Sequence, residues 1–137
     1  MQYKVHEWMM DLVVFVDPEA TISEALATMR RRYIQSLIVR KTDKYPYGII
    51  TSRDVSDKIV ALERNPREVL VKDIMTSPLI TVSPDMSLKK CAEIMRDNRI
   101  HHLPVQNEKG EIIGMIAAAD FLVAAEAMGR NPGEHLS

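Results

Sequence analysis

The sequence is poor in cysteine, in aromatic residues and in long apolar runs. Cys91 is its single cysteine, which excludes an intrachain disulfide and a cysteine-based zinc site. Aromatic residues make up 5% of the chain, so few side chains are available to stack on nucleic-acid bases. Apolar runs such as 12–16 are too short to span a bilayer, and residues 1–7 lack the order of a signal peptide. We therefore expect a cytoplasmic protein that does not enter a membrane.

The chain also lacks an excess of charge of either sign. Eighteen Lys and Arg residues oppose nineteen Asp and Glu residues, whereas a protein that binds duplex DNA normally carries a basic excess. We find no nucleophile–base set, no phosphate-binding loop and no metal-ligand spacing, so we expect no enzyme, no catalytic residue, no resident cofactor and no metal site. Length and composition, with 137 residues and 46% hydrophobic residues, are those of a globular protein.

An internal repeat is the main feature that is present. Shifting the chain by 66 residues aligns residues 5–61 with 71–127 without a gap and with thirteen identical pairs. Among these pairs are Gly48 with Gly114 and Asp54 with Asp120. The period is too long and the copies are too few for a solenoid, so we expect two similar units about a pseudo-twofold axis.

Each copy predicts the order β-α-β-β-α. Residues 13–16 and 79–82 read as short strands, and helices with one apolar stripe follow them. We expect a capping box between Thr21 and Glu24 in the first copy. In the second copy we expect only the N-cap residue, Ser87, because a lysine stands at the position of Glu24. A hairpin and a second helix complete each copy, with the apolar stripes 55, 59, 62 and 121, 125, 128.

Three motifs, in this order along the chain, resemble tandem cystathionine-beta-synthase (CBS) domains, which pair as a Bateman module. Residues 71–76, and in poorer form 5–9, resemble the first segment of that domain, and residues 99–105 resemble its central strand. Residues 48–54 fit its pattern Gly-h-h-(Thr/Ser)-x-x-(Asp/Asn), where h is apolar. The resemblance implies an α/β (α+β) fold with repeats at 1–64 and 71–130, a linker at 65–70 and a flexible tail at 131–137.

The resemblance further implies a regulatory module that binds an adenosine-containing small molecule in clefts between the repeats. The expected ligands are AMP, ADP, ATP or S-adenosylmethionine, and the expected output is an effect in trans on a regulated protein partner. The residues that the resemblance assigns to ligand binding are Thr51, Ser52, Arg53, Asp54, Ile80, His101, His102, Pro104 and Asp120.

The chemistry of Thr51 and Asp54 supports two interpretations. A carboxylate can accept two hydrogen bonds from a ribose diol, and a hydroxyl can donate to phosphate or ribose. Both residues are equally suited to cap the helix that follows them. In the second copy Ala117 replaces the hydroxyl, so we expect unequal sites, with the site of Asp120 weaker by up to about tenfold.

His101 and His102 are candidate phosphate contacts, because two imidazoles can donate to an anion and protonation would tighten binding as the pH falls. The alternatives are a solvent-facing histidine and a satisfied core histidine. The run 30–32 of arginines either forms a solvated helix end or clamps a polyphosphate. Cys91 lies on an apolar helix stripe and is expected in the core.

Three other functions compete with the ligand sensor. The chain could be a structural dimerisation module with degenerate clefts, or a protein that binds single-stranded RNA through its nucleotide clefts. An enzyme is the least favoured of the three, because the sequence shows no catalytic motif. We also expect a homodimer, a disk of four CBS domains, because the repeats leave apolar helix faces without a cover.

Overall fold

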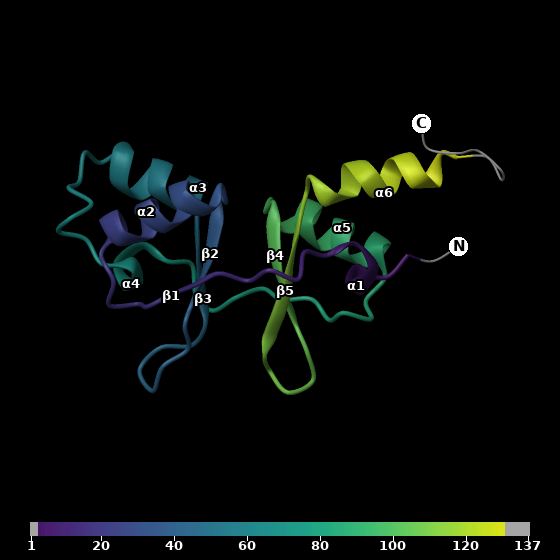
Figure 1. Cartoon of the computed structure of the whole chain (residues 1–137), viewed down its shortest axis with the longest axis horizontal. Coiled ribbons are helices and arrows are strands. Elements are labelled where there is room, and N and C mark those ends of the chain that lie inside the picture. Colours follow the sequence, from purple (N-terminus) through teal and green to yellow (C-terminus); the bar gives the residue numbers. More distant parts are fainter. Residues whose placement is uncertain (1–2, 131–137) are drawn as a thin grey trace. The chain divides into compact units, whose positions relative to one another are not determined.

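A computed structural model describes residues 3–130 of the chain and shows two compact units of helices and strands (Figure 1). The continuous unit consists of residues 13–80, and the split unit consists of residues 3–12 together with 81–130. The mixed α+β fold predicted from the sequence is confirmed. The predicted tail at 131–137 lies outside the described residues.

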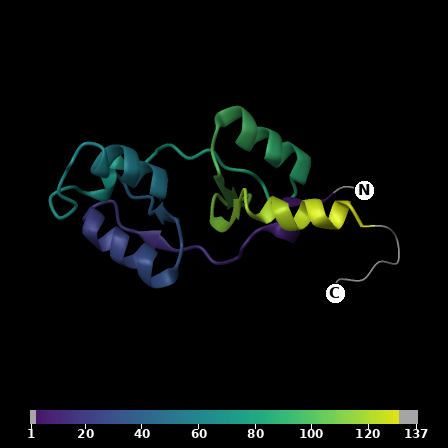
Figure 2. The same ribbon diagram turned by 90° about the horizontal axis from the view of Figure 1, so that it is seen from above.

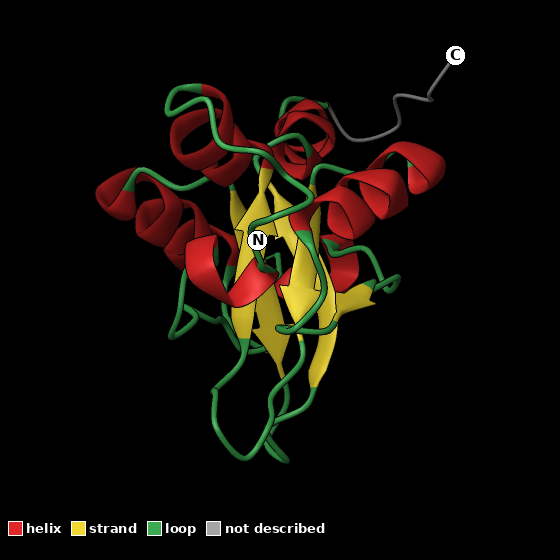
Figure 3. Ribbon diagram, turned by 90° about the vertical axis from the view of Figure 1, so that its left-hand side faces the viewer, coloured by secondary structure: helices red, strands yellow, loops and turns green. Residues whose placement is uncertain are grey.

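The continuous unit holds a three-stranded sheet in the order β1-β2-β3. Strand β1 runs parallel to β2, and β2 runs antiparallel to β3 in the predicted hairpin. The unit also contains three α-helices and one π-helix, which lie against the strands (Figure 3). Its elements are β1 (Phe15–Val16), α2 (Ile22–Arg32), β2 (Ser36–Val39), β3 (Gly48–Thr51), α3 (Ser52–Val55), η1 (Ser56–Val60) and α4 (Val71–Ile74).

The split unit repeats this arrangement around the antiparallel hairpin of β4 and β5. Its elements are α1 (Val5–Trp8), α5 (Leu88–Asn98), β4 (His102–Gln106), β5 (Ile112–Ala117) and α6 (Asp120–Met128). The predicted strand at 79–82 is wrong, because only Val82 pairs, as a single parallel bridge to Val105. The equivalent of Pro104 in β2 is Ile38, whose N–H donates to the carbonyl of Val14, directly before β1. Proline has no N–H to donate, so the second repeat lacks this hydrogen bond.

The first segment of each repeat is hydrogen-bonded to the other repeat. In the split unit, Met10 exchanges two backbone hydrogen bonds with Met115, at 2.8 and 2.9 Å. In the continuous unit, Thr76 exchanges two with Ile49, both at 2.9 Å. Helix α1 accordingly lies beside α5 and α6, as the purple segment beside the green and yellow helices shows (Figure 2). The two compact units therefore do not coincide with the two sequence repeats.

Helices α2 and α5 begin and end in the same way. Thr21 accepts a hydrogen bond from the backbone N–H of Glu24 at 3.2 Å, and Ser87 accepts one from Lys90 at 3.1 Å. The predicted capping box at Thr21 is only half formed, because within the described residues the backbone N–H of Thr21 donates no hydrogen bond to the Glu24 carboxylate. Both helices end at a residue with left-handed backbone, Tyr33 and Arg99.

The last helix of each repeat departs from the predicted apolar stripe. In the first repeat the backbone N–H of Ala61 donates to the carbonyl of Ser56, the i→i+5 bond of a π-helix, and Leu62 lies beyond η1 and is exposed. In α6 the core residue is Ala124, three positions after Phe121, while Ala125 and Met128 face solvent. The actual stripe of α6 is therefore narrower than predicted.

Each unit has its own apolar core, and most of the core positions correspond in the repeat. Cys91 is completely buried in the core of the split unit, as predicted. Within residues 3–130 no helix is long and apolar enough to cross a membrane. The buried core residues of the continuous unit are Val16, Ile22, Ala25, Met29, Leu37, Val39, Ile50, Ile59, Val69, Val71 and Ile74. Those of the split unit are Val5, Val82, Leu88, Cys91, Met95, Leu103, Val105, Ile116 and Ala124.

Candidate ligand-binding site

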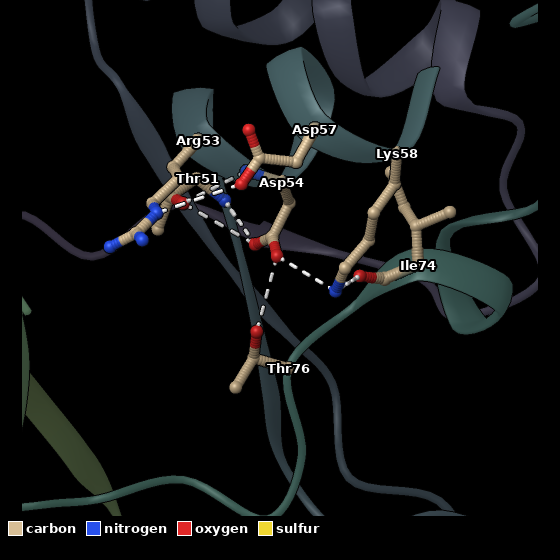
Figure 4. A network of polar contacts seen from close by, with 7 residues as sticks. All are labelled: Thr51, Arg53, Asp54, Asp57, Lys58, Ile74 and Thr76. Atoms are coloured by element: carbon tan, nitrogen blue, oxygen red, sulfur yellow. Dashed lines mark hydrogen bonds and ion pairs between the residues drawn. The ribbon is translucent and has the colours of Figure 1, made fainter. Parts of the chain in front are cut away.

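Asp54 lies in the first turn of α3, directly after β3, and is 8% exposed. Its Oδ2 accepts hydrogen bonds from the backbone N–H of Thr51 at 3.0 Å and from the Thr51 hydroxyl at 3.3 Å. Its Oδ1 accepts from Lys58 Nζ at 3.0 Å and from the Thr76 hydroxyl at 3.2 Å (Figure 4). A carboxylate offers about four lone-pair positions, so these donors occupy all of them. We call Thr51, Asp54, Lys58 and Thr76 the Asp54 network.

Lys58 connects this network to the last residue of α4. Its ammonium group donates to the carbonyl of Ile74 at 2.7 Å as well as to Asp54. Ile74 and Thr76 belong to the segment that pairs with β3, whereas Asp54 and Lys58 belong to α3 and η1. The network therefore fastens two stretches of the continuous unit that are about twenty residues apart in sequence.

The capping interpretation of Thr51 and Asp54 is confirmed. The Thr51 hydroxyl accepts from the backbone N–H of Asp54 at 3.4 Å, and the Asp54 carboxylate accepts from the backbone N–H of Thr51, which completes a capping box. The neighbouring Ser52 and Arg53 are exposed, and Arg53 forms an ion pair with Asp57 at 3.6 Å. Ile80, at the end of the continuous unit, is 45% exposed.

Asp120 holds the equivalent position in the split unit but has a different environment. Its Oδ2 accepts one hydrogen bond, from the backbone N–H of Ala117 at 2.7 Å. The three side-chain donors of the Asp54 network are replaced, in the register of the repeat, by Ala117, Ala124 and Met10. None of these side chains can donate a hydrogen bond, so the carboxylate of Asp120 is held by its backbone contact alone among the described residues.

The two histidines lie in the same unit as Asp120. His102 begins β4, opposite Ala117 of β5, and is half-buried, whereas His101 precedes the strand and is exposed. Burial lowers the pKa of His102 below its ordinary value of 6.5, the neighbouring His101 lowers it further, and Asp120 opposes the shift. His102 and Asp120 are therefore electrostatic neighbours.

Pro104, the remaining predicted site residue, is buried within β4 opposite Met115. Its burial is that of a packed strand residue. No group of three His, Cys, Asp or Glu side chains among residues 3–130 is placed to hold a metal ion.

The predicted residues thus fall into two groups, Thr51 with Asp54 in the continuous unit and His102 with Asp120 in the split unit. The sequence interpretation missed Lys58 and Thr76. The sequence does indicate the role of Lys58, because a cation four residues after an acid on a helix predicts an ion pair. It does not indicate the role of Thr76, because the contact with Asp54 depends on how the segment after α4 folds back onto β3.

Comparison with known proteins gives the family. The sequence model described as "CBS domain" matches twice, at residues 5–61 and 71–127. Among curated relatives, Uncharacterized protein MK0525 of Methanopyrus kandleri is 36% identical over 110 residues, which cover 80% of this chain and 56% of that protein. The chain spans about half the length of the first curated relatives that it matches.

Solved structures agree on the fold. A hexameric CBS-CP12 protein from bloom-forming cyanobacteria aligns with a TM-score of 0.86 and 28% identity, over 99% of this chain and 78% of that chain. CBSX2 in complex with AMP aligns with a TM-score of 0.74 over 93% of this chain and 99% of that chain. Its 21% identity supports a common fold only. With two matches in tandem over most of its length, the chain belongs to the CBS domain family.

Proposed function

We propose that this chain is a regulatory module that binds an adenosine-containing ligand, AMP, ADP, ATP or S-adenosylmethionine, and acts on a protein partner in trans without catalysis of its own. The observation that carries the proposal is the aspartate that each unit places at the start of a helix directly after a β-hairpin. Such a carboxylate can accept both hydroxyls of a ribose. The solved structure of CBSX2, which has this fold, holds AMP, a ligand of the proposed class.

His102 supports an anionic ligand near Asp120. Its imidazole is half-buried and depends for its charge on the pH and on its neighbours. A phosphate group beside it would favour the protonated form, while the ribose diol would occupy the carboxylate. A nucleotide satisfies both groups with one molecule.

Thermal unfolding with AMP, ADP, ATP and S-adenosylmethionine tests this proposal. A ligand present at one hundred times its dissociation constant adds about 2.7 kcal/mol to the free energy of unfolding. The matched control is ribose-free adenine at the same concentration, which should give a smaller shift. Absence of any shift with all four ligands at millimolar concentration would refute the adenosine-sensor function.

We further propose that two copies of the chain associate through the exposed apolar side chains of α6. Leu122, Val123 and Met128 are 73%, 56% and 66% exposed, and a group of exposed apolar residues on one helix is typical of an interface. Sedimentation equilibrium should give the mass of a dimer, and Leu122→Glu should shift it toward the monomer. A monomer mass for the unaltered chain at micromolar concentration would contradict the proposal.

If the chain dimerises but binds none of the four ligands, the structural dimerisation module becomes the better description. If it instead retards single-stranded RNA in a salt-dependent manner, the RNA-binding alternative gains support.

A further inference from the structure

Helix α2 ends in three consecutive arginines, Arg30, Arg31 and Arg32, and Tyr33 follows them. All three arginine side chains are exposed, and within residues 3–130 none of their guanidinium groups forms an ion pair or a hydrogen bond. Tyr33 is 95% exposed and has left-handed backbone. The end of α2 therefore presents three unpaired cations and one aromatic ring to solvent.

The acids around this helix end do not neutralise it. No Asp or Glu lies between residues 25 and 42, so no acid stands three or four positions from any arginine of the run. The first residue of α3 donates its backbone N–H to the carbonyl of Gln35 at 3.0 Å, which brings α3 close to the end of α2. The acids of α3 and η1, Asp54 and Asp57, have cations of their own at 3.0 and 3.6 Å.

Helix α5 shows how much positive charge such a helix end requires. It has eleven residues, as α2 has, and it ends at the same left-handed backbone. Its last three residues are Arg96, Asp97 and Asn98, and Arg96 is paired with Asp97 at 2.9 Å. A helix C-terminus favours a cation, yet one cation that is itself paired is sufficient here. The helix itself therefore does not account for the additional arginines of α2.

The arrangement favours an acidic protein segment over a nucleic acid. Arginine binds carboxylates through two parallel hydrogen bonds, and arginine and tyrosine are enriched among the residues that dominate protein–protein binding. Single-stranded nucleic acid is normally held along a positively charged groove with several aromatic side chains. The end of α2 has one aromatic residue, and its three arginines rise only about 4.5 Å along the helix axis. Residues 13–80 contain eleven Lys and Arg against nine Asp and Glu, so this unit carries no large positive charge.

We propose that the end of α2, from Arg30 to Tyr33, is a docking surface for an acidic segment of the regulated protein partner. The arginines bind carboxylates of that segment, and the ring of Tyr33 packs on the alkyl parts of its side chains. The inference rests on the proposed function for the existence of a partner in trans. It does not depend on the adenosine ligand, and it differs from a polyphosphate clamp, in which the arginines would hold the ligand itself.

Fluorescence anisotropy with a labelled peptide of ten glutamates, at low salt and without nucleotide, tests this surface. Arg31→Asp combined with Arg32→Asn gives α2 the last residues of α5, so the variant keeps a sequence that suits this helix end. We expect it to weaken the binding by about tenfold or more. Lys89→Asp combined with Lys90→Asn is the matched control, because it changes the net charge equally at the exposed start of α5 and should stay within about twofold.

Tyr33→Ser tests the aromatic part of the surface. It should weaken the binding of the same peptide by about fourfold, which is the effect of one buried methylene group. An unchanged affinity would remove Tyr33 from the docking surface.

A labelled strand of ten deoxythymidines and a titration with ATP examine the two alternatives. Tighter binding of the strand than of the peptide would overturn the proposal in favour of a nucleic-acid surface. A loss of ATP binding in the double arginine variant, as large as its loss of peptide binding, would assign the arginines to a polyphosphate clamp instead. No peptide binding at submillimolar concentrations of the unaltered chain, or equal losses in the variant and its control, would also overturn the proposal. If the peptide binds as expected and no adenosine ligand does, the docking surface stands and the adenosine-sensor function fails.

Discussion

The glycines that face the first segment of the opposite repeat give the sharpest test of the fold. A Cβ atom at Gly114 would lie 2.7 Å from Met9 Sδ and 2.8 Å from the backbone carbonyl oxygen of Met10. At Gly48, the equivalent position, it would lie 2.7 Å from Met75 Sδ but 3.2 Å from the nearest backbone oxygen. The sulfur atoms end flexible side chains that can move aside, whereas the carbonyl of Met10 is fixed by its pairing with β5.

The structure therefore predicts that Gly114→Ala destabilises the protein more than Gly48→Ala. Overpacking a filled site costs about 1–3 kcal/mol, and the lower chain entropy of unfolded alanine returns about 0.4–1 kcal/mol. If the segment shifts away instead, the two hydrogen bonds between Met10 and Met115 are lost, at about 0.5–1.5 kcal/mol each. Either route costs about 1–3 kcal/mol before the entropy gain, so the net loss for Gly114→Ala is about 1–2 kcal/mol. The loss for Gly48→Ala should be smaller, because only the flexible Met75 side chain would lie closer than 3 Å to the new Cβ atom.

Urea unfolding measures these losses. With a slope of about 2 kcal/mol per molar, Gly114→Ala should lower the midpoint by about 0.5–1 M. Gly129→Ala is the matched control, because its Cβ would meet nothing closer than 3.7 Å, and it should change the stability by less than about 0.5 kcal/mol. Faster hydrogen exchange at Met10 in Gly114→Ala would locate the effect. Equal midpoints for Gly114→Ala and Gly129→Ala would refute the close packing of residues 9–10 against β5.

Three further predictions concern charge and reactivity. Asp54→Ala should cost about 2–3 kcal/mol of stability and Asp120→Ala about 1 kcal/mol, because four donors lose their acceptor in the first case and one in the second. Equal losses of unfolding free energy in urea titrations would contradict this difference between the two aspartates. Burial and His101 lower the pKa of His102 in the folded state, and Asp120 only partly opposes this shift. The unfolded state therefore binds the proton more tightly, so the free energy of unfolding should rise with pH up to about 6.5. His102→Gln should reduce this dependence on pH. Burial raises the pKa of the Cys91 thiol to about 11, so a disulfide reagent at pH 8 should label it only as fast as the protein unfolds, and rapid labelling of the native chain would show that Cys91 is accessible.

The sequence predicted those parts of the fold that depend on local pattern. The spacing of apolar residues gave α2 and α5, and the turn residues gave the hairpin of β4 and β5. The strand at 79–82 failed because its pairing depends on a partner strand that has Pro104 in place of a residue with an N–H. The spacing of apolar residues and the strand propensity each describe one segment at a time, so they do not include this dependence on the neighbouring strand.

The candidate site was predicted by residue but not by environment. The repeat identified Asp54 and Asp120 as equivalent, and the helix-capping alternative for Asp54 was correct. The contact of Thr76 with Asp54 depends on the return of its segment to β3, which no local pattern encodes. The π-helix η1, which contains Lys58, could likewise not be predicted, because the apolar residues of this region have the spacing of an α-helix.

The exchange of first segments explains why equivalent residues can have different roles. Each unit receives its first segment from the other sequence repeat, so the neighbours of Asp54 include Thr76, whereas the second repeat meets Met10 at that position. A substitution in one segment therefore changes the surroundings of the aspartate in the other repeat. Met10, Ala117 and Ala124 replace the three residues whose side chains donate to Asp54, and none of the three can donate a hydrogen bond to Asp120. The hydrogen bond from the backbone N–H of Ala117 to the Asp120 carboxylate is kept. Such a combination preserves the geometry of the helix start and removes the competition for its acceptor atoms. For that reason the two aspartates share one position at a helix start and differ in the number of hydrogen bonds that they accept within residues 3–130.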